Sequence, residues 1–162
     1  MSRAKTVLIL GGMALGILGM AYGVWYAVFA EHQALDGIGA SLAQSFTAAA
    51  QRNPGTADHA MANYREAKYA YDRQVDVHSH WLGLSMLLII VGLSADGVGY
   101  SEKLKSLLAW CLLAGAFLFP AGVLMQTWSH GTLPRMVAIA ASGLVIAALG
   151  FTALGFLRRE TA

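Results

Sequence analysis

Apolar and polar positions are grouped into long blocks along this chain, and four blocks are apolar enough to cross a bilayer. They cover about residues 7–29, 78–95, 106–128 and 133–156. A helix rises about 1.5 Å per residue, so about 20 apolar residues cross a hydrocarbon core of about 30 Å. The pattern therefore predicts four membrane-spanning α-helices.

One long polar segment, residues 31–77, separates the first two apolar blocks. Asn53-Pro54-Gly55 is a strong turn signal, which divides this segment into two predicted helices. The first helix is expected over about Leu35–Gln51 and the second is expected to begin near Thr56. No helix breaker separates the second helix from His78, so we expect it to continue into the second span.

The composition agrees with a membrane protein. Hydrophobic residues make up 57% and charged residues 12% of the chain, against a usual charged share of about 25%. The net charge of +2, without a long basic run, gives no reason to expect a nucleic-acid partner. Cys111 is the only cysteine, so no disulfide can form within the chain and no C-x-x-C-H haem attachment motif is present.

Together these features predict an all-α fold. We expect residues 1–162 to form one integral membrane domain, a four-helix bundle with an extramembrane helical segment between spans 1 and 2. Membrane lipid is then the first partner of the chain, because lipid covers the apolar outer surface of such a bundle.

The distribution of basic residues predicts the orientation. With four spans, both termini and the loop over residues 96–105 share one side of the membrane. Basic residues in short segments near the ends of spans mark the cytoplasmic side. On the other side, most basic residues are diluted in the long polar segment. We therefore expect both termini to be cytoplasmic, in a bacterial-type inner membrane. The basic residues on the terminal side are Arg3, Lys5, Lys103, Lys105, Arg158 and Arg159.

All five histidines fall on the opposite, outer side in this orientation, and the ends of a four-helix bundle converge there. Ligating side chains near membrane depth are functional-site candidates. His59 lies on a water-exposed helix and is the expected bystander. His78 and His80 are two residues apart, about 200° around a helix, so at most one of them points at a given ligand. The other two candidates are His32 and His130.

Two kinds of metal site are compatible with these residues. Zinc prefers four ligands in a tetrahedral array, which would need His32, His130 and a carboxylate such as Glu31 or Asp76. Haem needs only one or two axial histidines and a large apolar slot. The apolar, glycine-rich surroundings favour haem b over zinc.

The central part of the chain resembles the styrene oxide isomerase family, small membrane proteins with four spans and b-type haem. The resemblance covers about half of the chain. It begins at His78-Ser79, runs through the apolar stretch to Gly99-Tyr100-Ser101-Glu102-Lys103 and includes Leu107-Leu108. The spacing from the His-Ser pair to the lysine matches without a gap, and Gly23-Val24-Trp25 near the end of the first span is also similar.

The resemblance implies that His78 is an axial ligand of the haem iron. It also implies that haem lies between neighbouring subunits of a trimer. In this family ferric iron acts as a Lewis acid on an epoxide, and a hydride shift yields an aldehyde. In the same register, the asparagine, aspartate and tyrosine that the family uses are replaced here by Leu84, Gly115 and Val123. None of these three can form a hydrogen bond through its side chain.

Three functions remain open at this point. The first is an epoxide isomerase with an open iron site and an apolar small-molecule substrate. The second is a bis-histidine haem protein for electron transfer or sensing, with His130 or His80 as second ligand. The third is an accessory membrane subunit without a cofactor. We predict a homo-oligomer that binds haem b through His78, and the candidate contacts of the haem are His78, His80, Trp81 and His130.

Overall fold

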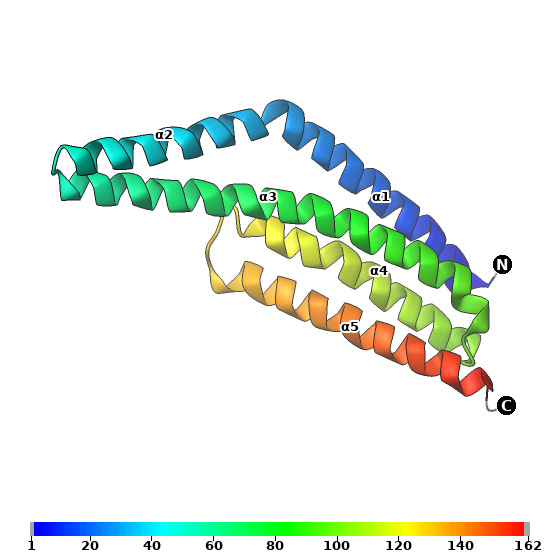
Figure 1. The fold of residues 1–162 in the computed structure, drawn as a ribbon. Helices are drawn as coiled ribbons and strands as arrows, with labels where there is room; N and C mark the ends of the chain where they lie inside the picture. The colour runs from blue at the N-terminus through cyan, green and yellow to red at the C-terminus, as the bar shows by residue number, and fades with distance from the viewer. Residues whose placement is uncertain (1, 161–162) are drawn as a thin grey trace.

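The computed structural model describes residues 2–160, which form five α-helices and a short 3-10 turn and contain no strand (Figure 1). This confirms the predicted all-α fold. The elements are α1 (Arg3–Phe29), α2 (Glu31–Ala50), α3 (Pro54–Ser94), η1 (Ala95–Gly97), α4 (Glu102–Met125) and α5 (Thr132–Glu160).

Four of these helices, α1, α3, α4 and α5, are long and apolar enough to cross a membrane, as predicted. Two of the differences between the helical boundaries and the predicted spans concern α4. Helix α4 ends at Met125 rather than at residue 128, because residues 126–128 form a turn in which the Thr127 hydroxyl donates to the carbonyl of Leu124. Helix α4 also begins at Glu102, so Lys103, which we expected in a loop, lies in its first turn.

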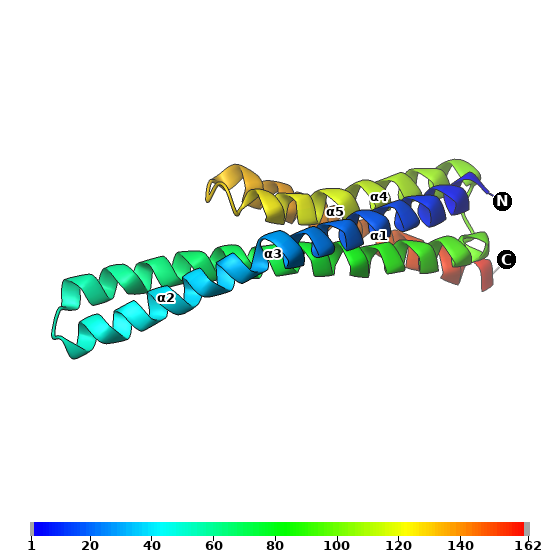
Figure 2. The same cartoon turned by 90° about the horizontal axis from the view of Figure 1, so that it is seen from above.

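Helix α2 and the first half of α3 form an antiparallel hairpin that extends beyond α4 and α5 (Figures 1 and 2). We call this hairpin, residues 31–77, the arm. Arg52 has a φ of 53° in the connecting turn, and the side chain of Asn53 accepts a hydrogen bond from the backbone N–H of Thr56. Asn53 is the N-cap, so the helix begins at Pro54, two residues before the start predicted near Thr56. Proline suits the first turn of a helix. Helix α3 continues without a break from the arm into the second span, as predicted.

Small residues mark the closest helix contacts. Helix α1 packs on α3, and α4 packs on α5. A Cβ added to Gly92 of α3 would lie 2.9 Å from the side chains of Leu8 and Ile9 in α1. A Cβ added to Gly115 of α4 would lie 2.7 Å from Val145 in α5. In lipid, helices associate through such close packing, because apolar side chains gain little by leaving the lipid for another helix.

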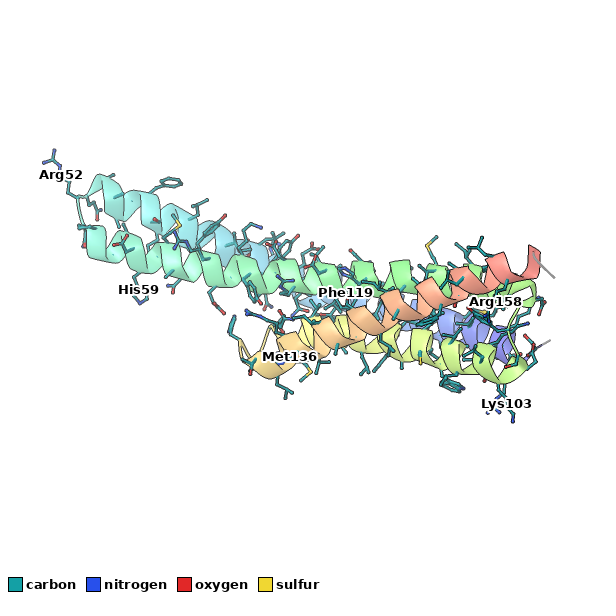
Figure 3. All side chains as sticks on the ribbon, turned by 90° about the horizontal axis from the view of Figure 1, so that it is seen from below. Arg52, His59, Lys103, Phe119, Met136 and Arg158 are labelled. Atoms are coloured by element: carbon teal, nitrogen blue, oxygen red, sulfur yellow. The ribbon has the colours of Figure 1, made fainter. Side chains whose placement is uncertain are left out.

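The polar groups lie mostly at the two ends of the molecule. Arg52 and His59 lie on the arm, and Lys103 and Arg158 lie at the opposite end, where α1 begins and α5 ends (Figures 1 and 3). Between them, large apolar side chains such as Ile17 and Ile146 are exposed on the outer surface. A bilayer around this middle region would cover them.

Candidate functional site

His78 lies in the contact between α3 and α1. Its Nδ1 is 2.9 Å from the carbonyl oxygen of Gly19. Its ring also lies against Gly23, where a Cβ atom would overlap with Nδ1 and Cε1 of the imidazole. Gly19 and Gly23 are four residues apart and therefore share one face of α1. The two glycines form a notch that accommodates the ring.

The hydrogen bond to Gly19 determines the tautomer of His78. A backbone carbonyl can only accept, so Nδ1 carries the proton and the lone pair of the neutral ring is on Nε2. Among the residues that the structure describes, none makes a polar contact with Nε2 of His78. Metal-binding histidines typically donate their second ring N–H to a carbonyl or carboxylate in this way. The surroundings of His78 therefore suit a metal ligand.

The notch around His78 can be tested by packing. The change Gly23→Ala places a methyl group on the imidazole, so we expect the ring to shift and the bond to Gly19 to weaken. Overpacking of this kind costs about 1–3 kcal/mol of unfolding free energy. Thermal unfolding in detergent measures the effect. Gly83→Ala is the matched control, because no atom lies within 4 Å of its added Cβ. An equal change in both variants would contradict a specific role of the notch.

His80 faces a different helix. Its Nδ1 is 2.6 Å from the carbonyl oxygen of Asp76 in the preceding turn, and its ring packs edge-on against Phe119 of α4, with centroids 4.8 Å apart. His78 contacts α1 and His80 contacts α4, which agrees with the 200° separation expected from their spacing. The two rings are thus not available to one iron within a single chain.

His130 lies in the connection between α4 and α5 and contacts the arm. Its Nε2 is 3.3 Å from a carboxylate oxygen of Glu66, and its ring centroid is 5.2 Å from that of Tyr69. Both partners belong to the arm part of α3. His130 and His78 therefore contact different parts of the molecule, and the role of His130 as a second iron ligand stays a prediction.

The expected convergence of the outer-side histidines and carboxylates is not observed. His32 pairs with Asp36 on α2 at 3.5 Å, while Glu31 accepts a hydrogen bond from Tyr71. Asp76 pairs with Arg73. Among the side chains of residues 2–158, no group of three or more histidine, cysteine, aspartate or glutamate residues is placed to hold a metal ion. The ligands considered for zinc are therefore not brought together among the described residues.

Trp81 lies in the core beside the His78 contact. Its side chain is buried, its indole N–H donates to the carbonyl oxygen of Phe117 at 3.4 Å, and its ring meets Tyr22 edge-on at 5.5 Å. Pro120, inside α4, has no N–H for the carbonyl of Ala116, the neighbour of Phe117. Trp81 thus joins α3 to a part of α4 where the helix lacks a hydrogen bond. Contact of Trp81 with a haem stays a prediction.

Tyr22 and Gln74 were not among the predicted site residues. The Tyr22 hydroxyl donates to Oε1 of Gln74. Gln74 precedes His78 by four residues, so both side chains lie on the face of α3 that contacts α1. This spacing was visible in the sequence, but the pairing with Tyr22 depends on how α1 and α3 are aligned.

An open apolar groove of about 700 Å³ runs along the outer face of α1, and all of its lining residues belong to that helix. Gly16 belongs both to the groove and to the α1–α3 contact, since a Cβ there would lie 3.1 Å from the hydroxyl oxygen of Ser85. The groove is a candidate for the large apolar slot that a haem requires. Its lining residues are Gly16, Ile17, Met20, Ala21, Val24, Trp25 and Phe29.

The three positions that lack the polar residues of the isomerase family serve packing. Val123 is buried, and Gly115 lies against Val145. Leu84 is partly buried and packs against the core. None of these three side chains can donate or accept a hydrogen bond.

No protein-family model, characterised protein or solved structure matches this chain.

Proposed function

We propose that this chain is a membrane haem b protein in which Nε2 of His78 is an axial ligand of the iron. The observation that carries this proposal is the hydrogen bond from Nδ1 of His78 to Gly19, which leaves the lone pair on Nε2. The apolar groove along the outer face of α1, which shares Gly16 with the α1–α3 contact, offers a surface for the macrocycle. The rigid notch at Gly23 orients the imidazole.

The chemistry that we propose is isomerisation of an apolar epoxide to a carbonyl compound. Ferric haem, when bound, supplies a Lewis acid for the epoxide oxygen. The contacts of His80 with α4 and of His130 with the arm keep both rings away from His78 within one chain, which favours a single histidine ligand and an open position on the iron. The apolar residues around the groove would exclude water and hold the substrate through apolar contacts.

We further propose a homo-oligomer, a trimer by the resemblance, with both termini cytoplasmic in a bacterial-type inner membrane. The groove is on the outer face of α1, so a neighbouring copy could cover it. The short basic segments at the end that holds Lys103 and Arg158 support this orientation (Figure 3).

The proposal predicts a high-spin ferric haem in detergent-purified protein, because one axial histidine leaves the iron five-coordinate. The measurement is an ultraviolet–visible spectrum of oxidised and reduced protein, with a pyridine haemochrome assay for haem b. With no added oxidant or reductant, the ferric protein should convert an aryl epoxide to the corresponding aldehyde. Gas chromatography measures the formation of the aldehyde.

Two outcomes would change this conclusion. A low-spin spectrum with sharp reduced bands would indicate two axial ligands and favour electron transfer or sensing. In that case His130→Ala should convert the iron from six- to five-coordinate, whereas an open site predicts no change in this variant. Protein that lacks haem even after expression with haem supplied would exclude both haem functions and leave an accessory subunit.

A further inference from the structure

A pocket of about 320 Å³ lies between the last turn of α1, the first turns of α2 and the arm part of α3. Helix α1 ends at Phe29 and α2 begins at Glu31, and the chain bends between them (Figure 1). A Cβ added to Gly37 would have no atom within 4 Å. Small residues on both walls thus leave room for a ligand. These small residues are Ala30, Ala34, Gly37, Ala67 and Ala70.

The pocket is also lined by a tyrosine whose hydroxyl has no partner. Tyr26 is only 7% exposed, and its hydroxyl oxygen is buried without a hydrogen-bond partner among the described residues. A buried tyrosine hydroxyl usually has a partner, because burial without one costs free energy. The ring of Tyr71, which also lines the pocket, lies beside it with centroids 6.3 Å apart. A ligand group that bonds to the Tyr26 hydroxyl would remove this cost.

The charge beside these two tyrosines is negative. The Tyr71 hydroxyl donates to Oε1 of Glu31 at 3.3 Å, and among the described residues no lysine or arginine contacts this carboxylate. On α3, Lys68 and Arg73 both have carboxylate partners of their own. Of the described residues that line the pocket, none is basic. A carboxylate with a single hydrogen bond from a neutral hydroxyl can accept more, so it favours a cationic ligand.

We propose that this pocket binds an organic amine in its ammonium form, with an apolar body against the small residues and the charged nitrogen at Glu31. An ammonium group can donate both to the Glu31 carboxylate and to the Tyr26 hydroxyl oxygen. An aromatic ring face next to the cation adds a favourable electrostatic interaction. A phosphatidylethanolamine headgroup would also bring a phosphate, for which the pocket lining offers no basic side chain. The site is independent of the proposed haem function.

The test is equilibrium dialysis of the detergent-purified protein against 4-phenylbutylamine and 4-phenylbutanol at pH 7, with protein-free detergent as the blank. Aliphatic amines have a pKa of about 10, so the amine is charged, whereas the alcohol is neutral and nearly the same shape. We expect the amine to bind about tenfold more tightly than the alcohol. Glu31→Gln should weaken amine binding about tenfold, the effect of losing a hydrogen bond between charged groups, and leave the alcohol unchanged.

Two further variants sharpen this test. Asp36→Asn is the matched control, because Asp36 is also an acidic residue of α2 but pairs with His32 and not with a tyrosine of the pocket. It should bind both compounds as the unchanged protein does. Tyr26→Phe keeps the ring and removes the hydroxyl, so it should weaken amine binding about threefold. Its thermal stability should stay the same or rise, because a buried hydroxyl without a partner is removed.

Four results would overturn the proposal. Equal binding of the amine and the alcohol would show that charge is not recognised. Full amine binding in Glu31→Gln, or an equal loss in Asp36→Asn, would exclude Glu31 as the binding group. Displacement of the amine by phosphatidylethanolamine but not by phosphatidylglycerol would assign the site to a lipid headgroup. Glu31→Gln retains an acceptor oxygen for the Tyr71 hydroxyl, and size-exclusion profiles verify that the variants are folded.

Discussion

Replacement of His78 by alanine is expected to remove bound haem, with the affinity falling more than about tenfold. Loss of a hydrogen bond behind a metal ligand alone costs about 10–100-fold, so loss of the ligand itself should cost at least this much. His78 is placed by α1 through Gly19 and Gly23, and no other histidine contacts that notch among the described residues. The measurement is the haem-to-protein ratio and the Soret band of the purified variant.

The His78→Ala variant also leaves the notch empty, so the loss of packing must be distinguished from the loss of the iron ligand. Added imidazole should restore the Soret band in His78→Ala, because it supplies a ligand nitrogen in the space of the lost ring. A purely structural histidine would not give this rescue. His59→Ala is the matched control, since His59 lies on the arm with Asn63 as its neighbour. Full haem content and an unchanged Soret band in His78→Ala would exclude His78 as the ligand.

The change Gly122→Leu is expected to lower the free energy of unfolding by about 3 kcal/mol, the upper end of overpacking costs. A Cβ at this position would lie 2.7 Å from the backbone nitrogen of Ala138 and 3.0 Å from its Cα. Backbone atoms cannot rotate away as a side-chain tip can. The leucine would therefore force α4 and α5 apart along their contact. Thermal unfolding in detergent and the elution profile on size exclusion measure this effect.

Gly143→Leu is the matched control for this prediction. Gly143 is on α5 and has no atom within 4 Å of its added Cβ, so a leucine there points away from the neighbouring helices. We expect no loss of stability, and a small gain is reasonable because glycine is a poor helix former. An equal loss in both variants would show that the α4–α5 contact is not the cause.

The sequence by itself determined the elements of this protein. Four apolar blocks of sufficient length predicted the four long apolar helices, and Asn53-Pro54-Gly55 predicted the turn of the arm. The spacing of His78 and His80 predicted that their rings face different neighbours. These properties depend on chain length, helical period and local turn chemistry, all of which are encoded over a few consecutive residues. The start of α3 was predicted two residues late, because Asn53 and Thr56 are both residue types that cap helices well.

Only the tertiary structure decided which helix each ring meets. The position of His78 over Gly19 and Gly23 and the bond from Tyr22 to Gln74 both join segments far apart in the sequence. The separation of His32 from His130 is likewise a property of the assembled bundle. In a membrane protein the buried and lipid-facing sides of a helix are both apolar, so hydrophobic pattern does not reveal how a helix is rotated. Rotation and alignment follow from many small packing contacts, which exist only once the helices are assembled.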